Sequence, residues 1–596
     1  MLGKYGWRRI GGILIAICFL FLPGCQQGAS NSEGLRGAVK SSDGKPMEGV
    51  AVSAQGQGKT FTTSVYTDGD GEYYFPPLES GAYRVWAQAV GFDADRSELT
   101  VAPGEGAQQD FTLQPLQDFE AQLSGTEWIN SLPSDSPEDR RMRRVFQYTC
   151  GPASGCHLTN FIMAKRFDAA GWDLMIDYMA ENQTAPGSLL RKVMQGNKDD
   201  LVKYLTRIRG PEPHPWKFQP HPRATGEANQ IVVTEYDVPR GDRPDDYSLH
   251  TNGSDWTQGV ASRLEGNAIH DAVLGHDGNI YFTDDSTPER TIGKLDPKTG
   301  KVTGYKLADK DGLAVSTHGI ITDQEGSIWL TNGTEGTILK FDPRTEQFQR
   351  FPKPSSMTPR IGGTITVDSK GNLWATQPTG AFRLNPKTGE YTEYKSVTPG
   401  GNQYGIAIDS EDNAWFAHLG ADRVGYINGR TGEVGEVVIP PATKEIDPKD
   451  VEIAKRTGAW VDDVPAMYQS GPRRLGTDPK GDTVWVGEYF AGRLGKINIH
   501  TKEYTGYEVP NPASNPYDAR VDKNHMVWVA LMNSDRIARF DPATEQFTEY
   551  PFPTLGTDTR FIEIDNSTDP PTIWIPYYRP NRMARIQFRT GAGSGK

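Results

Sequence analysis

Residues 316–331 read STHGIITDQEGSIWLT, with the turn Asp323-Gln324-Glu325-Gly326 between two short apolar stretches. β-Branched and aromatic residues on both sides of a tight turn predict a β-hairpin. Two more strand-like segments follow, ILKFDPRT at residues 338–345 and FQRFP at residues 348–352. This part of the chain therefore predicts four consecutive antiparallel strands.

The same pattern returns along the second half of the chain. Its core, a turn followed by a strand with a central aromatic residue, is centred on Tyr281, Trp329, Trp374, Trp415, Trp485, Trp528 and Trp574. Repeats about 40 to 50 residues apart are typical of β-propeller blades. The predicted fold class is mainly β, with a seven-bladed β-propeller over residues 228–590.

The ends of the repeat array predict how the ring closes. The last copy stops at residues 585–588 without an outer strand, whereas residues 231–239 match an outer strand but precede the first copy. Pairing these segments closes the ring and covers exposed strand edges. An insertion at residues 442–470 interrupts the spacing, and we expect it to form a flap or a helical excursion from one blade.

Composition limits the domain organisation and the partners. The chain has 596 residues, 63 Lys and Arg against 76 Asp and Glu, and a net charge of −13. A chain of this length divides into several domains. Acidic charge without a nucleic-acid motif disfavours nucleic acid as a partner. We expect a modular protein whose partner is a small-molecule or peptide ligand.

The first residues have the pattern of an export signal. A basic segment precedes an apolar run over residues 10–22 that is too short to span a bilayer. The run ends at LPGC, which resembles the lipobox of bacterial lipoproteins. The resemblance implies a signal peptide at residues 1–24, lipidation of Cys25 and a tether at residues 25–34. The protein would then be extracytoplasmic and membrane-anchored, in the outer membrane or periplasm of a Gram-negative cell.

Residues 35–116 alternate apolar and polar positions between turns, which predicts a small β-sandwich. The segments TDGDGEYYF at residues 67–75 and LESGAYRV at residues 78–85 resemble the carboxypeptidase regulatory-like, or transthyretin-like, domain. We expect this domain to space or dock the rest of the protein and to do no chemistry.

Residues 118–223 have a helical period, with predicted helices over residues 137–148, 169–179 and 199–205. The segment CGPASGCH, residues 150–157, and RFDAAGW, residues 166–172, resemble small cytochrome c modules. The resemblance implies haem c held by Cys150, Cys156 and His157, with Met163, Met175, Met179 or Met194 as the second axial ligand. Haem attachment usually needs two residues between the cysteines, and here there are five. A Cys150–Cys156 disulfide is the alternative.

Polar and aromatic residues occupy matching positions of the repeats. The predicted inner-strand ends are His270, His318, Gly363, Tyr404, Arg473, Tyr517 and Arg560. The positions three residues after each aromatic core residue are Asp284, Asn332, Gln377, His418, Glu488, Leu531 and Tyr577. Differing polar groups at one face indicate a ligand-binding funnel. We expect His270, His318, His418 and Glu488 to lie around its axis.

The repeats resemble the virginiamycin B lyase (streptogramin lyase) family over residues 228–590. The resemblance implies a carbon–oxygen lyase with His318 and His270 as catalytic residues and Mg²⁺ bound at the funnel, here by His270 and Asp284. The glutamates of the family do not follow, because Ser316 and Gly333 stand at their positions. The fold is therefore expected to transfer, and the lyase reaction is not.

Three functions follow. The first is binding of a small extracellular ligand by the propeller, either alone or followed by cleavage by elimination. The second is electron transfer by a periplasmic c-type cytochrome between haem in the middle domain and a substrate on the propeller. The third is non-catalytic binding at the cell surface.

Overall fold

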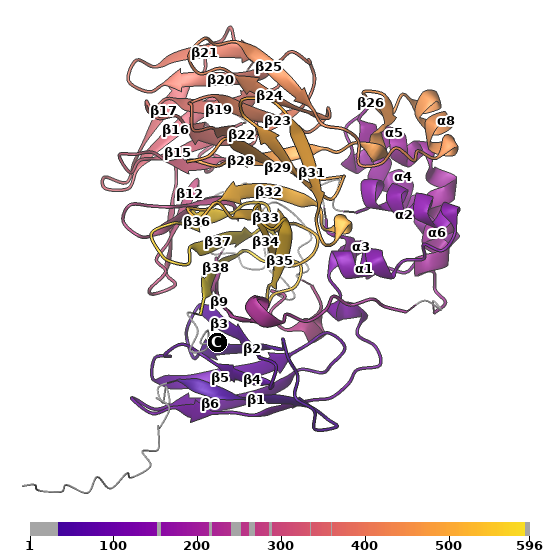
Figure 1. Cartoon of the computed structure of the whole chain (residues 1–596), viewed down its shortest axis with the longest axis vertical. Helices are drawn as coiled ribbons and strands as arrows, with labels where there is room; N and C mark the ends of the chain where they lie inside the picture. Colours follow the sequence, from indigo (N-terminus) through magenta and orange to yellow (C-terminus); the bar gives the residue numbers. More distant parts are fainter. Residues whose placement is uncertain are drawn as a thin grey trace, which may run out of the picture.

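The computed structural model describes residues 34–151, 157–213, 217–239, 252–260, 269–284, 289–333, 335–358 and 360–589. Figure 1 shows three parts: a stack of β-sheets from the second half of the chain, an N-terminal β-domain at its lower end, and a helical domain at its side. The expected signal peptide, Cys25 and Cys156 lie outside the described residues. Among the described helices, none combines the length and the apolar character that crossing a membrane requires.

Six antiparallel sheets hold four strands each, paired in the order of the sequence. Their strands are β10 (Ile269–Leu274), β11 (Ile280–Asp284), β12 (Ile292–Leu295) and β13 (Val302–Tyr305); β14 (Ile320–Thr322), β15 (Ile328–Asn332), β16 (Thr337–Asp342) and β17 (Gln347–Pro352); β18 (Ile365–Val367), β19 (Leu373–Gln377), β20 (Gly380–Asn385) and β21 (Glu390–Lys395); β22 (Gln403–Ile408), β23 (Ala414–His418), β24 (Arg423–Ile427) and β25 (Val434–Val438); β28 (Pro472–Thr477), β29 (Thr483–Glu488), β30 (Arg493–Asn498) and β31 (Tyr504–Glu508); β32 (Pro516–Val521), β33 (Val527–Leu531), β34 (Arg536–Asp541) and β35 (Gln546–Pro551).

The recurring tryptophan is tied to the turn of its own sheet. The indole Nε1 of Trp329 donates a hydrogen bond to the carboxylate of Asp323 at 2.7 Å. Equivalent bonds join Trp374 to Asp368, Trp415 to Asp409 and Trp528 to Asp522. A buried indole N–H needs such a partner, which explains why the turn and the aromatic residue recur together.

The first strands of these sheets pack around one axis. β10 contacts β14, and the contacts continue in order through β18, β22, β28 and β32. The backbone N–H of Ile562, just before β36 (Glu563–Asp565), donates to Asp518 on β32, and β36 contacts β10. The sheets therefore form a closed, propeller-like ring.

An eight-stranded sheet joins this ring to the N-terminal domain. Its order is β36, β37 (Thr572–Tyr577), β38 (Arg582–Phe588), β9 (Ile231–Asp237), β3 (Phe61–Tyr66), β2 (Ala51–Gly56), β5 (Gly81–Gln88) and β6 (Asp95–Val101). The pairing of β9 with β38 confirms the predicted closure. The other edge of β9 pairs with β3, so the two domains share one continuous sheet, which the sequence analysis did not predict.

The second sheet of the N-terminal domain consists of β1 (Leu35–Ser41), β4 (Glu72–Tyr74), β7 (Ala107–Gln108) and β8 (Phe111–Leu113). Val39, Val52, Val65 and Val85 are fully buried in the core of this domain. Alternation of inward apolar and outward polar residues along a strand produces such a core.

The helical domain contains α1 (Gly125–Ser131), α2 (Pro137–Thr149), α3 (Thr159–Met163), α4 (Ala169–Tyr178), the π-helical segment η3 (Met179–Gln183), α5 (Leu189–Gly196) and α6 (Lys198–Arg209). The three predicted helices correspond to α2, α4 and α6, and the analysis missed the short α1, α3 and α5.

The insertion at residues 442–470 contains a helix, α8 (Pro448–Thr457), and a hairpin of β26 (Trp460–Val461) and β27 (Val464–Pro465). This confirms the expected helical excursion. α8 packs on α5, and the buried Arg141 of α2 lies 2.7 Å from Asp450 of α8. The insertion therefore fastens the helical domain to the ring (Figure 1).

Candidate functional site

β-Bulges at the inner-strand ends bring consecutive polar side chains to the axis. The pairing register shifts within residues 269–272 of β10, 403–406 of β22, 472–475 of β28 and 516–519 of β32. A bulge re-aims side chains that a regular strand would point to opposite faces. The sequence analysis counted one residue per strand end and so missed Asp271, Arg474 and Asp518. Two consecutive polar or aromatic residues at the start of an otherwise apolar strand could have indicated each bulge from the sequence.

Two histidines lie in contact at the centre of the site. The ring centroids of His270 and His318 are 3.9 Å apart. Nδ1 of His270 is 2.7 Å from Asp271, and Nδ1 of His318 contacts the carbonyl oxygen of Gly363. Because both partners are acceptors, these contacts assign the proton to Nδ1 and leave Nε2 with the lone pair. The Tyr404 hydroxyl lies 3.2 Å from Nε2 of His318.

The surroundings keep both imidazoles neutral. Burial lowers the pKa of His270 well below its ordinary value, and the positive charges of Arg474, Arg560 and Arg473 lower this pKa further. Burial also lowers the pKa of His318, followed by the effect of His270. Both imidazoles are therefore neutral at neutral pH and keep a lone pair on Nε2, although the Tyr404 hydroxyl already contacts Nε2 of His318 and the lowered pKa values make both rings weak bases.

Arg473 lies among three tyrosine rings. Its guanidinium carbon is 4.0 Å from the ring centroid of Tyr517, 4.5 Å from that of Tyr489 and 5.2 Å from that of Tyr404. A guanidinium within about 6 Å of an aromatic face is attracted by the ring. Arg473 is 9% exposed, and its Nε atom has no hydrogen-bond partner in the described part of the chain.

Two further arginines at the axis are ion-paired. Arg474 donates to Asp271 at 2.8 Å, which is the carboxylate that also faces His270. Arg560 lies 3.6 Å from the ring centroid of Tyr578 and donates to Asp558, and Arg579 donates to the same carboxylate. The predicted inner-end residues His270, His318, Tyr404, Arg473, Tyr517 and Arg560 therefore form one connected cluster. The seventh, Gly363, is covered by the ring of Tyr404.

The second set of predicted residues does not join this cluster. Asp284 is ion-paired with Arg290, and Glu488 is ion-paired with Arg493. Asn332 and Gln377 form hydrogen bonds with Glu335 and Glu393, respectively. His418 lies beside Glu436, and the ring of Tyr577 packs at a tilt against Phe552. These residues end the second strands, one strand further from the axis than the inner ends. The expectation that His418 and Glu488 would lie around the axis with His270 and His318 is corrected accordingly.

The groups available for a metal differ from those expected. Atoms of His270, Asp271 and His318 lie within 4.8 Å of one another, whereas Asp284 faces Arg290. Asp271 already accepts hydrogen bonds from His270 and Arg474, and the site is surrounded by arginines. Magnesium prefers several oxygen ligands. Of the two carboxylate oxygens of Asp271, only Oδ2 lacks a partner among the described residues. Two imidazoles and this one oxygen, in a positive environment, do not supply the oxygen ligands that magnesium prefers.

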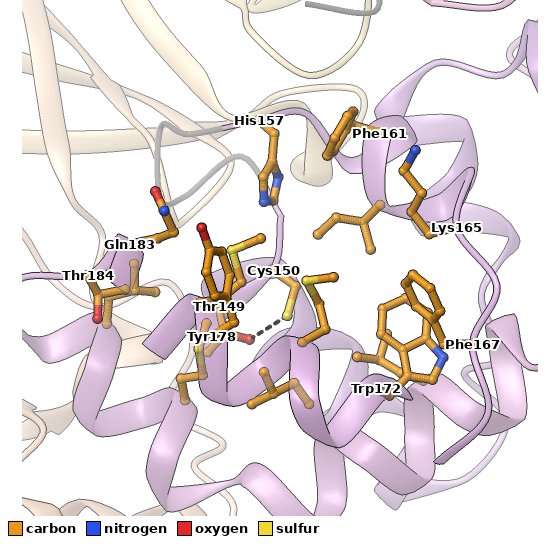
Figure 2. Close-up of a pocket in the computed structure, with 17 residues that line it drawn as sticks. Thr149, Cys150, His157, Phe161, Lys165, Phe167, Trp172, Tyr178, Gln183 and Thr184 are labelled. Atoms are coloured by element: carbon orange, nitrogen blue, oxygen red, sulfur yellow. Dashed lines mark hydrogen bonds between the residues drawn. The ribbon is translucent and has the colours of Figure 1, made fainter. Parts of the chain in front are cut away.

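A second site lies in the helical domain, where an apolar cavity of about 280 Å³ opens between α2, α4 and α5. Cys150, His157, Trp172, Met175, Met179 and Met194 are among the residues that line it. In Figure 2, His157, two residues before the start of α3, extends into the cavity, and the hydroxyl of Thr149 contacts the thiol of Cys150. Met163 is fully buried outside the lining of this cavity.

The cavity brings together two predicted haem-binding residues. Cys150 is buried and has no disulfide partner among the described residues, and burial raises its pKa to about 11. Nδ1 of His157 is buried without a hydrogen-bond partner among the described residues, and burial lowers the pKa of the imidazole to about 4. Because Cys156 lies outside the described residues, the haem and disulfide alternatives both stay predictions.

The cavity and the propeller axis are neighbours. The positive charge of Arg579, next to Tyr578 at the axis, is the second cause of the lowered pKa of His157. Leu158 packs in the same apolar cluster as Tyr489 and Tyr517. The loop that carries His157 therefore lies against the ring of axis residues.

Comparison with known proteins identifies two parts of the chain. Residues 34–114 match the carboxypeptidase regulatory-like domain, and residues 265–464 match the virginiamycin B lyase family. No curated protein matches the chain.

Solved structures with a similar fold include a streptogramin B lyase, at 18% identity over 61% of this chain and 100% of that chain, with a TM-score of 0.47. They also include a catalytically inactive virginiamycin B lyase from Staphylococcus aureus with quinupristin, at 18% identity over 60% of this chain and 100% of that chain, with a TM-score of 0.45. A hydrazine synthase from Kuenenia stuttgartiensis covers 55% of this chain and 98% of its own, at 12% identity and a TM-score of 0.42. Residues 34–114 are thus similar to the carboxypeptidase regulatory-like domain, and residues 265–464 are similar to the virginiamycin B lyase family.

Proposed function

We propose that this chain is an exported, lipid-anchored protein whose seven-bladed propeller binds a small extracellular ligand at its axis. One observation carries the proposal: residues in or just before five inner strands, His270, His318, Tyr404, Arg473 and Tyr517, meet in one connected cluster. Burying polar and charged groups costs free energy unless they are partnered. A cluster with an unpartnered guanidinium is therefore better explained by a ligand than by packing.

Elimination across an ester is the reaction that these groups fit best. Nε2 of His270 or His318 takes the proton from the carbon next to a carbonyl group. The electron pair of that C–H bond forms a carbon–carbon double bond as the C–O bond of the ester breaks, and the carboxylate leaves with the electrons of the broken bond. Neighbouring guanidinium groups stabilise the developing negative charge. No step in this scheme requires magnesium.

Incubation with quinupristin, the compound named for the S. aureus lyase structure, tests the proposal. Elimination opens the ring without changing the mass, whereas hydrolysis adds one water. We expect an isomer of unchanged mass by liquid chromatography and mass spectrometry, and its loss in His270→Ala and His318→Ala. The exposed His500 provides the matched control, His500→Ala. If quinupristin binds but its ring does not open, the chain is a non-catalytic surface binding protein. The absence of both binding and ring opening overturns the proposal.

A second candidate, electron transfer, is favoured by the cavity of the helical domain. Its apolar lining fits a haem, with Cys150 and Cys156 as attachment points, His157 as one axial ligand and Met175, Met179 or Met194 as the other. Bound haem supplies one-electron transfer. The neutral His157 provides a nitrogen that can bind iron at neutral pH. The neighbouring Leu158 packs in the same apolar cluster as Tyr489 and Tyr517 of the propeller axis. This arrangement suits exchange of electrons with a substrate bound there.

A further inference from the structure

We propose that the propeller axis takes a carboxylate anion, held by the guanidinium groups of Arg473 and Arg474. The inference rests on the proposed function and names the chemical class of its ligand. The two arginines are consecutive residues at the bulge of β28, which brings both against the rings of Tyr404 and Tyr517.

Arg473 provides the first observation. It is nine-tenths buried, and its Nε atom is buried without a hydrogen-bond partner among the described residues. Its described neighbours are the faces of Tyr404, Tyr489 and Tyr517. Aromatic faces attract a cation but do not accept the five N–H groups of a guanidinium. A buried arginine of this kind has unused donors, and an anion is the ligand that satisfies them.

Arg474 provides the second observation. Its Nη1 atom donates to Asp271, but Nε and Nη2 are buried without a partner in the described residues. The residue is 1% exposed. Two adjacent guanidinium groups thus have unpartnered N–H donors in the same buried region.

The charges around the site favour an anion over a cation. Each nearby carboxylate is ion-paired with an arginine: Asp271 with Arg474, Asp518 with Arg520, and Asp558 with both Arg560 and Arg579, although Oδ2 of Asp271 has no hydrogen-bond partner among the described residues. Arg473 lacks such a partner among the described residues, so one added negative charge balances one buried positive charge. A divalent cation would instead increase the repulsion.

A carboxylate matches the site better than a larger or more highly charged anion. The planar guanidinium pairs with a carboxylate through two parallel hydrogen bonds. The hydroxyls of Tyr404 and Tyr517 are bonded to each other, and that of Tyr404 also to His318, so the rings of these tyrosines offer the ligand apolar surface for its organic part. Ester elimination also releases a carboxylate, so the same groups would bind the leaving group of the proposed reaction.

Thermal unfolding of the full chain with benzoate as the probe tests the inference. We expect benzoate to raise the unfolding midpoint in a saturable manner, and the neutral isostere benzamide, inorganic phosphate and magnesium chloride to raise it much less. Arg473→Met should weaken benzoate binding at least tenfold. Arg473→Lys keeps the charge but loses the planar fork, so it should weaken binding by a smaller factor. Arg430→Met, an exposed position on the same ring, should bind like the wild type.

The outcomes separate this inference from the proposed function. Equal binding of benzamide and benzoate, tighter binding of phosphate, or unchanged benzoate affinity in both Arg473 variants overturns the carboxylate site. If Arg473→Met does not fold, the Arg473→Lys comparison decides. Quinupristin turnover without benzoate binding leaves the proposed function standing and removes the inference. Benzoate binding without binding or turnover of quinupristin leaves the carboxylate site standing and removes the proposed elimination.

Discussion

The hydroxyl groups of Tyr404 and Tyr517 lie 2.8 Å apart and join β22 to β32 across the intervening β28. Arg473 of β28 stacks on both of these rings. The Tyr404 hydroxyl also reaches Nε2 of His318. A single tyrosine thus connects the aromatic cage of Arg473 to the histidine pair, and the geometry of both depends on it.

Removal of the Tyr404 hydroxyl should therefore lower the stability of the folded protein more than removal of the Tyr517 hydroxyl. Tyr404→Phe leaves His318 Nε2 and the Tyr517 hydroxyl without their partner, whereas Tyr517→Phe breaks only the bond between the tyrosines. We expect a loss of about 1 to 2 kcal/mol in the first variant and about 1 kcal/mol in the second. Chemical denaturation followed by tryptophan fluorescence measures both. Equal effects of the two substitutions would show that the contact with His318 contributes nothing to stability.

The repeat pattern was sufficient to predict the sheets and the closing strand. The aromatic core residue and the turn aspartate form one local hydrogen-bonded unit, as for Trp329 and Asp323, so each copy can be recognised from a short segment. The inner-strand ends were also predictable, because a blade repeats its position relative to the turn. This counting correctly placed His270, His318, Tyr404 and Arg473 together.

Three features depended on long-range packing and were missed. The bulges that add Asp271 and Arg474 to the site change the two-residue period of a strand, which a regular count assumes. His418 and Glu488 were expected at the axis, but their charged partners, Glu436 and Arg493, come from strands further out in their own sheets. The pairing of β9 with β3 joins segments about 170 residues apart, and no local pattern encodes such a contact.

The closing pair of strands contains a buried ion pair that should be essential for stability. Arg582 of β38 donates to Glu235 of β9 at 2.8 Å, and both side chains are 1% exposed. Arg582→Met leaves Glu235 as an unpaired buried charge, for which we expect a loss of about 3 to 5 kcal/mol. Arg585→Met, on the same strand and packed over Trp574, is the matched control. A similar shift of the thermal midpoint in both variants would refute a special role for the ion pair.

His157 should make the protein without haem less stable in acid. Burial and the charge of Arg579 lower its pKa to about 4 in the folded state, against an ordinary value near 6.5. Between these values the unfolded chain binds more protons than the folded one, so stability falls as the pH is lowered from about 6.5 to 4. The contribution is up to about 3 kcal/mol. His157→Gln should reduce this dependence in unfolding experiments at a series of pH values, and an unchanged slope would contradict the assignment.

The cavity in the helical domain leads to a spectroscopic prediction. Expressed in a periplasm with haem c maturation proteins, the chain should show a Soret band and sharp α and β bands after reduction, because Cys150, His157 and three methionines line one apolar cavity. Cys150→Ser and Cys156→Ser should each weaken covalent attachment, detected as haem that organic solvent extracts. Met194→Leu, Met179→Leu and Met175→Leu identify the second ligand, because only the variant at the ligand position should shift the reduced spectrum and the reduction potential.

Absence of the bands, together with a Cys150–Cys156 disulfide found by mass spectrometry, would eliminate electron transfer through this domain. That result would leave the propeller site unaffected, since the side chains of this site come from the propeller and not from the helical domain.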